Sequence, residues 1–214
     1  MLFRSTADNL RIRLAHWAAK DPRGTVFLFP GRTEYVEKYG RTAGIICDLG
    51  FDMIAIDWRG QGLSERLIKD PMVGHVRDFS EYQRDLDAVL DFADARNFPK
   101  PWYILAHSMG GAIGLRALQR DLGFKSVAFT GPMWGILVPA LLSPFRKIIA
   151  KLGISFGFGD RYPPTTSDQS YTVVSDFQDN TLTPDKEMWD YMKQQVVQHP
   201  DLQLAGPSFL WADA

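Results

Sequence analysis

One serine stands between an apolar run and a helix-like stretch, in the segment Trp102-Tyr-Ile-Leu-Ala-His-Ser108-Met-Gly-Gly111. A serine hydroxyl is a poor nucleophile at neutral pH, so it needs a general base and backbone N–H groups that stabilise an oxyanion. A sharp strand-to-helix turn, the nucleophile elbow, exposes the hydroxyl to both. The pattern therefore predicts that Ser108 is the nucleophile of an acyl-transfer reaction. The alternative is an ordinary serine at the end of a strand.

Small residues around this serine support the elbow interpretation. Gly110 and Gly111 are expected to support the turn, because a larger side chain would collide with the neighbouring strand or helix as the chain doubles back. Ala106 stands where the motif G-x-S-x-G has its first glycine, and alanine is the smallest replacement. The helix after the turn is predicted over 109–120.

A second loop could supply an oxyanion donor. The apolar run Thr25–Phe29 is a predicted strand, and Pro30-Gly31-Arg32 follows it. In an enzyme of this plan, one donor is the residue after the nucleophile and the other lies in this loop. We therefore expect the backbone N–H groups of Met109 and Arg32 to form the oxyanion hole. A plain strand-to-helix loop is the alternative.

A third segment, Asp57-Trp-Arg-Gly-Gln-Gly-Leu-Ser64, follows the predicted strand Phe51–Ile56 and has spaced glycines. Neither of the phosphate-binding patterns G-x-x-x-x-G-K-[ST] and G-x-G-x-x-G is present in it. A tight structural turn is therefore the better interpretation.

Together, the segments Pro30–Tyr39, Asp57–Ser64 and Ala106–Gly111 resemble the α/β-hydrolase family, in particular its lysophospholipase and monoacylglycerol-lipase branch. The resemblance implies Ser108 as nucleophile and a lipid ester as substrate, with no cofactor. Many members have His-Gly where this chain has Pro-Gly, so that side chain is not expected to do chemistry. A dehalogenase or epoxide hydrolase is disfavoured, because those relatives carry aspartate at the elbow.

The rest of a catalytic triad is not evident. In this fold the acid and then the histidine follow the serine, on loops after later strands. Only one later strand is predicted, Ser126–Thr130, and it leads into Gly131-Pro132 without a carboxylate. No histidine follows a late strand, so surface or packing roles are expected for all four of them: His16, His75, His107 and His199. The interpretation is a truncated hydrolase that lacks its last strands together with the acid and the histidine.

Two functions from different classes remain open. In the first, the complete protein hydrolyses carboxylic esters of monoacyl lipids, and the sequence does not separate esters from thioesters. In the second, the 214-residue chain is a catalytically incomplete pseudo-enzyme that binds an apolar ligand or a partner chain. The second hypothesis has a physical difficulty, because strand 126–130 would then be an exposed edge that promotes aggregation.

The order of elements predicts an α/β protein with a doubly wound, mostly parallel sheet and helices on both faces. Helices are also expected over 34–49 and 79–97, and an N-terminal edge strand over 9–17. The second helix has an apolar stripe, and its acidic residues are expected in solvent on the other face: Glu81, Asp85, Asp87, Asp91 and Asp94.

The chain is expected to divide into a hydrolase core over 1–132, a helical cap over 133–206 and the start of a return to the core over 207–214. Apolar residues recur at helical intervals over 141–152, and a further helix is predicted from Thr183 as N-cap with Pro184 in its first turn. An apolar cap suits an acyl chain, since each buried methylene contributes about 0.8 kcal/mol. An insert that packs only its own small core is the alternative.

Composition restricts the partners. A net charge of −1 argues against nucleic acid as a partner, and no clustered His or Cys predicts a metal site. The single cysteine, Cys47, excludes an internal disulfide and is expected in the core. No apolar run suggests a signal peptide or membrane span. The expected location is therefore the cytoplasm, with peripheral contact at the inner face of the membrane left open.

Overall fold

The computed structural model of this chain describes residues 2–135, 145–164 and 166–214. Six strands of this part form one sheet in the order β1-β2-β4-β3-β5-β6. Their bounds are β1 Leu2–Ser5, β2 Arg11–Trp17, β3 Thr25–Phe29, β4 Asp52–Asp57, β5 Trp102–His107 and β6 Phe124–Thr130.

The sheet is mostly parallel. Strand β3 pairs in parallel with β4 and with β5, and β5 pairs in parallel with β6, whereas β1 and β2 form an antiparallel extension beside β4. The two central strands β3 and β4 are buried at every residue, which explains their continuous apolar character. Strand β1 was not predicted, because four residues at the chain start are too few to reveal a period. The expectation that the strand over 9–17 lies at the sheet edge was therefore wrong, since β2 pairs with β1 on one side and β4 on the other.

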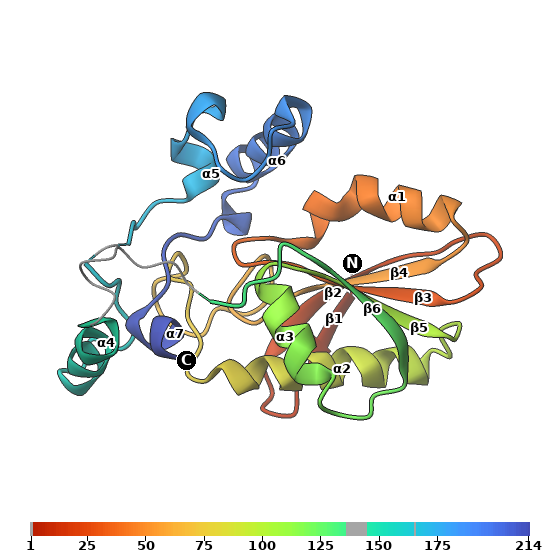
Figure 1. Cartoon of the computed structure of the whole chain (residues 1–214), viewed down its shortest axis with the longest axis horizontal. Helices are drawn as coiled ribbons and strands as arrows, with labels where there is room; N and C mark the ends of the chain where they lie inside the picture. The colour runs from red at the N-terminus through yellow and green to blue at the C-terminus, as the bar shows by residue number, and fades with distance from the viewer. Residues whose placement is uncertain (1, 136–144, 165) are drawn as a thin grey trace.

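Helices cover both faces of the sheet (Figure 1). On one face, α1 (Gly40–Asp48) follows the short 3-10 helix η1 (Val36–Tyr39) and packs on a smaller apolar cluster. On the other face, α2 (Tyr82–Ala95) and α3 (Met109–Ala117) pack on the larger cluster, and η2 (Phe79–Glu81) leads into α2. The predicted doubly wound arrangement is confirmed.

Strand β6 is at one edge of the sheet. Its side chains alternate between half-buried and exposed at most positions, and no other strand pairs with its outer side in the part of the chain that the structure describes. Its half-buried Val127 and Phe129 pack against the larger apolar cluster. The edge therefore presents unpaired backbone groups.

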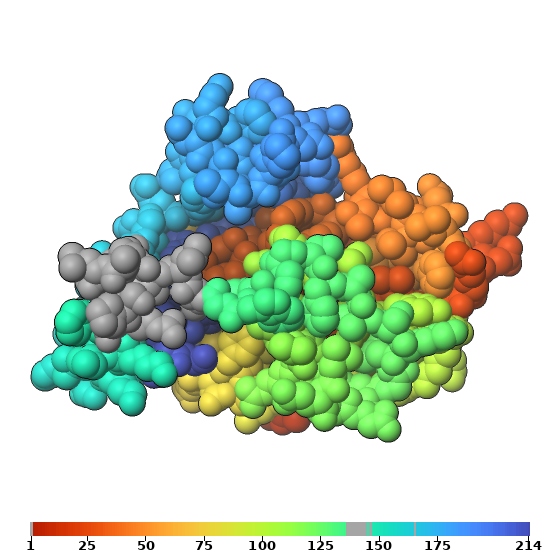
Figure 2. Space-filling view, viewed as in Figure 1, coloured from red at the N-terminus to blue at the C-terminus, as the bar shows by residue number. Residues whose placement is uncertain are grey.

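The second half of the chain adds short helices that lie beside the sheet. They are α4 (Arg146–Ser155), α5 (Tyr171–Val174), η4 (Phe177–Asp179), α6 (Lys186–Gln198), η5 (Pro200–Leu202) and α7 (Phe209–Asp213). Figure 2 shows α5 and α6 as a lobe raised above the body of the molecule. The apolar positions predicted at 141 and 142 lie outside the described residues.

The predicted start of the last cap helix was wrong by two residues, because the N-cap is Asp185 and not Thr183. The carboxylate of Asp185 accepts the N–H groups of Glu187 and Met188 and is the N-cap of α6. The hydroxyl of Thr183 instead accepts the N–H of Asp185. Both residue types cap helices, and aspartate adds a charge that favours the helix N-terminus.

Two expectations about single side chains were also wrong. Asp85 is fully buried, because its carboxylate accepts hydrogen bonds from the side chain of Arg59 at 2.9 Å and its backbone N–H at 3.0 Å. A buried guanidinium needs such a counter-charge. Cys47 is half-buried on α1 and does not belong to the core.

No helix in the described ranges combines the length and the apolar character that crossing a lipid bilayer requires.

Candidate active site

Ser108 lies at the turn between β5 and α3, in a conformation that residues with a side chain rarely adopt. Its φ is 50° and its ψ is −118°, which costs about 1–3 kcal/mol of strain. Its N–H donates to the carbonyl of Thr130 at 3.1 Å. Its carbonyl accepts the N–H groups of Gly111 and Met133, each at 2.9 Å. A strained serine held between a strand and a helix is the geometry of a nucleophile elbow.

Glycine is required for steric reasons in the first turn of α3. A Cβ on Gly110 would overlap the carbonyl oxygen of Phe29 and stand 2.6 Å from that of Pro30. A Cβ on Gly111 would stand 2.8 Å from the Cβ of Pro132. Neither glycine has a positive φ, so the close approach of β3 and of the chain after β6, rather than backbone freedom, excludes larger residues.

The loop after β3 approaches the serine at Gly31, where an added Cβ would stand 3.0 Å from the Cβ of Ser108. Arg32 comes next, and Met109 is the first residue of α3. Neither of their backbone N–H groups donates to an acceptor among the described residues. The N–H of Met109 also carries the partial positive charge of a helix N-terminus. Both groups can therefore donate to an oxyanion.

Glu34 holds this loop in place, a role that the sequence did not predict. Its buried carboxylate accepts hydrogen bonds from the N–H of Gly31, the hydroxyl of Tyr39 and the ammonium of Lys38. Burial alone would raise the pKa of Glu34, but the charges of Lys38 and His107 and these hydrogen bonds bring it below its ordinary value. Glu34 is therefore a charged residue that fixes the loop beside the serine.

The segment Asp57–Ser64 supports the same loop from β4. The carboxylate of Asp57 accepts the N–H of Val36 at 2.8 Å, and the side-chain carbonyl of Gln61 accepts the N–H of Thr33 at 2.6 Å. Both glycines of the segment have positive φ, 75° and 51°. The segment is a tight structural turn, and its conformation positions the residues around Arg32.

Three of the four histidines have polar partners other than Ser108. His107 lies 3.0 Å from the hydroxyl of Thr130 through Nδ1 and 3.7 Å from Glu34 through Nε2. His75 Nδ1 is 2.9 Å from the hydroxyl of Ser208, and burial lowers the pKa of His75. His16 pairs with a carboxylate at 3.0 Å, and His199 ends α6. In the described ranges, no side chain makes a hydrogen bond to the hydroxyl of Ser108, and no three His, Cys, Asp or Glu side chains form a metal site.

Helix α6 contacts the loop region beside the serine. The hydroxyl of Tyr35 donates to the carbonyl of Met192 at 3.2 Å, and the hydroxyl of Tyr191 donates to the carbonyl of Glu37 at 3.0 Å. A small buried cluster that includes Tyr35 and Val196 adds apolar contact. The second half of the chain is thus attached to the segment that follows Arg32.

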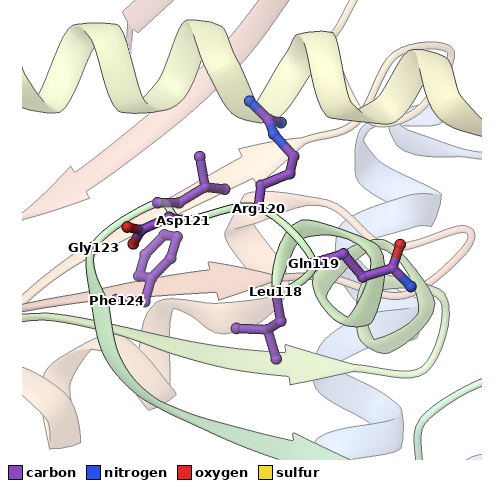
Figure 3. A pocket seen from close by; sticks show the side chains of 7 residues that line it. Leu118, Gln119, Arg120, Asp121, Gly123 and Phe124 are labelled. Carbon is purple, nitrogen blue, oxygen red and sulfur yellow. The ribbon is translucent and has the colours of Figure 1, made fainter.

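Two surface hollows lie away from Ser108. One of about 370 Å³ is lined by residues 118–124, beyond the C-terminal end of α3, whereas Ser108 precedes its N-terminal end. Figure 3 shows Arg120 there, reaching toward α2, where it pairs with Asp87 at 2.5 Å. The other, of about 310 Å³, includes His16 and Asp52 at the start of β4. Ligands of such sheets bind at the carboxyl ends of the strands, where Ser108 lies.

Comparisons with known proteins agree with this arrangement. The family model described as "Serine aminopeptidase, S33" matches residues 20–194. Lysophospholipase L2 of Escherichia coli is 35% identical over 95% of this chain and 59% of its own length. Probable lysophospholipase L2 of Haemophilus influenzae is 30% identical over 94% of this chain and 63% of its own length. The chain thus spans about three fifths of these relatives.

Solved structures show the same fold. A soluble variant of monoglyceride lipase from Saccharomyces cerevisiae, in complex with a substrate analog, has a TM-score of 0.69 at 22% identity and covers 100% of this chain and 66% of that chain. Monoacylglycerol lipase of Paleococcus ferrophilus has a TM-score of 0.61 at 18% identity, with 92% and 66% covered. At such identities the likeness concerns the fold alone, which is the α/β-hydrolase fold expected from the sequence.

Proposed function

The chain belongs to the hydrolase family described as serine aminopeptidase, S33, and on this basis we propose that the complete protein is a serine ester hydrolase of monoacyl lipids. The observation that carries the proposal is the strained turn that holds Ser108 beside Gly31. Relatives named lysophospholipase and monoglyceride lipase support a lipid ester as substrate.

In the proposed reaction, the hydroxyl oxygen of Ser108 attacks the ester carbonyl carbon while a general base removes its proton. The resulting oxyanion accepts hydrogen bonds from the backbone N–H groups of Arg32 and Met109. The base then gives the proton to the leaving alcohol, and the acyl group stays on the serine. Water, activated by the same base, releases the fatty acid.

We place the acid and the histidine of this reaction in a part of the complete protein outside these 214 residues. The four histidines here either have other partners or lie away from Ser108, and the relatives are longer than this chain. The alternative, a catalytically incomplete binder of an apolar ligand or partner chain, is favoured by no specific observation.

The region 133–206 is proposed to be a cap over the active site, with 1–132 as core and 207–214 as the start of a return to it. Its attachment to Tyr35 and Glu37, next to the expected oxyanion loop, supports this division. A cap in this position would shield the acyl chain from water.

We further propose that α4 and the segment after it contact a lipid surface. Five large apolar side chains, from the N-cap of α4 to the segment after the helix, are 44–73% exposed: Phe145, Ile148, Leu152, Phe156 and Phe158. Lys147 and Lys151 of the same helix are exposed and would favour anionic lipid. Cosedimentation with phosphatidylglycerol vesicles should weaken in Ile148→Ser but not in Val197→Ser, a similarly exposed control on α6. Equal binding of both variants and wild type would contradict this contact.

The substrate proposal is tested by hydrolysis. The full-length protein should release fatty acid from a lysophospholipid or a monoacylglycerol, and Ser108→Ala should release none. Release by the Ser108→Ala variant at the wild-type rate would exclude Ser108 as the nucleophile. If the wild-type protein cleaves short-chain esters but neither lipid, the proposed esterase activity stands and the proposed lipid substrate is contradicted.

A further inference from the structure

Arg32 is half-buried and, unlike the buried Arg13 and Arg59, has no counter-ion among the described residues. Arg13 pairs with two carboxylates at 2.5 and 2.6 Å, and its side chain is 0% exposed. Arg59 pairs with three carboxylates at 2.8–3.4 Å, and its side chain is 1% exposed. A guanidinium removed from water without an anion is costly, so the contrast is significant.

The contacts of the Arg32 guanidinium leave donors unused. One Nη donates to the carbonyl of Ala205, and the Nε is buried without a partner in the described ranges. The guanidinium carbon lies 5.3 Å from the ring centroid of Trp211. The hydroxyl of Tyr162 is also buried without a described partner, and burial raises the pKa of Tyr162 to about 12 although the charge of Arg32 acts in the opposite direction. Among the described residues, these contacts of the cation are with neutral groups, and its Nε–H has no acceptor.

Arg66 makes contacts similar to those of Arg32, so a comparison of the two shows how the charges around Arg32 differ. It too donates to carbonyls of the segment before α7, those of Asp201 and Gln203. Burial lowers the pKa of both arginines, but the charges of Asp57 and Asp201 act in the opposite direction on Arg66. By contrast, no carboxylate of the described residues forms an ion pair with Arg32.

Arg32 lies next to the residues of the proposed reaction. It follows Gly31, which packs against Ser108, and its own backbone N–H is the expected oxyanion donor. Its side chain passes Gly74, where an added Cβ would stand 2.7 Å from an Nη, so the glycine leaves room for the guanidinium. The residue is half-buried as a whole, and part of it remains open to solvent.

We propose that the guanidinium of Arg32 binds the phosphate group of a lysophospholipid substrate. A planar fork of N–H donors matches phosphate oxygens, and an anion would supply the charge that the described neighbours lack. In a lysophospholipid the phosphate and the ester are joined by one glycerol unit, so an arginine side chain beginning at the oxyanion loop suits that separation. The inference rests on the proposed ester hydrolysis and specifies its head group.

The test compares two lipids that share an acyl chain, palmitoyl lysophosphatidylethanolamine and monopalmitoylglycerol, on the full-length protein. Arg32→Gln keeps the backbone N–H and replaces the guanidinium by a shorter, neutral amide. We expect the ratio of kcat/KM for the lysophospholipid to kcat/KM for monopalmitoylglycerol to fall at least about tenfold, since a charge-assisted hydrogen bond to substrate is lost in one case only. Arg66→Gln, the matched control, should leave the ratio of the two values unchanged.

Other results would overturn the assignment. An equal loss on both lipids in Arg32→Gln would mean that the guanidinium stabilises the structure, for example through a carboxylate elsewhere in the complete chain. Binding of inorganic phosphate that depends on Arg32, without discrimination between the lipids, would assign the site to free phosphate. If the wild-type protein cleaves monopalmitoylglycerol but not the lysophospholipid, and Arg32→Gln does not change that activity, the head-group inference is refuted and the proposed ester hydrolysis stands. Cleavage of neither lipid refutes the proposed function itself.

Discussion

The carboxylate of Glu34 accepts a hydrogen bond from the backbone N–H of Gly31, the residue that packs against the Cβ of Ser108. One buried charge thus fixes the conformation of the loop that faces the nucleophile. Because the N–H of Gly31 is used in this contact, the N–H of the next residue is left for an oxyanion.

Glu34→Ala should therefore reduce catalysis. It leaves the N–H of Gly31 without its acceptor and loosens the loop, and we expect kcat to fall about 10–100-fold, since one oxyanion donor contributes up to about 10²–10³. Glu34→Gln keeps an acceptor and should lose less. The measurement is steady-state ester hydrolysis by the full-length protein. Glu187→Ala, which breaks the exposed pair with Arg41, is the control, and an unchanged kcat in Glu34→Ala would refute the role.

Gly110→Ala should destabilise the fold, because its Cβ would overlap a carbonyl oxygen at the end of β3. Such overpacking costs about 1–3 kcal/mol. Gly44→Ala on α1 is the matched control, since nothing lies within 4 Å of its added Cβ. That substitution should stabilise the helix by about 0.5–1 kcal/mol. Urea unfolding compares the two, and equal effects of the same sign would contradict the packing described for the elbow.

The pairing of Asp8 predicts a dependence of stability on pH. Burial alone would raise the pKa of Asp8, but hydrogen bonds from Arg59, Thr6 and Arg84 bring it below its ordinary value of 3.8. A lowered carboxyl pKa contributes stability above the ordinary value and loses it as the pH falls through the folded value. Asp8→Asn should cost about 1–2 kcal/mol at pH 7.

This difference between Asp8→Asn and wild type should shrink progressively below about pH 4, the region in which the unfolded carboxyl becomes protonated. Chemical unfolding at several pH values measures it. A difference that stays constant from pH 7 to acid would mean that the charge of Asp8 contributes nothing to the fold.

Local signals in the sequence were sufficient for the fold. Apolar runs with the length of strands predicted β3, β4 and β5, and the small residues around Ser108 predicted the turn between β5 and α3. These strands and this turn depend on residues that are neighbours in the sequence, so each can be predicted from a single segment. Strand β6 was predicted two residues too short, because Gly123 and the charged Lys125 interrupt the apolar pattern around Phe124.

Contacts between distant segments were not predictable in the same way. Glu34 belongs to a segment that the sequence singled out, but its role depends on Tyr39, on Lys38 and on the fold of the loop back onto Gly31. Asp85 has the helical spacing of a solvent-facing residue, and only the position of Arg59, from another element, buries it. A charged residue on a helix gives no local sign of a buried partner.

The central claim is that Ser108 is an activated nucleophile, and fluorophosphonate labelling followed by intact-mass measurement tests it most directly. We predict one adduct on Ser108 in the full-length protein, none in Ser108→Ala, and none in the 214-residue chain alone. Labelling of Ser108→Ala to the same extent as wild type would contradict the claim. Labelling of the 214-residue chain as fast as the full-length protein would instead show that the general base lies within these residues.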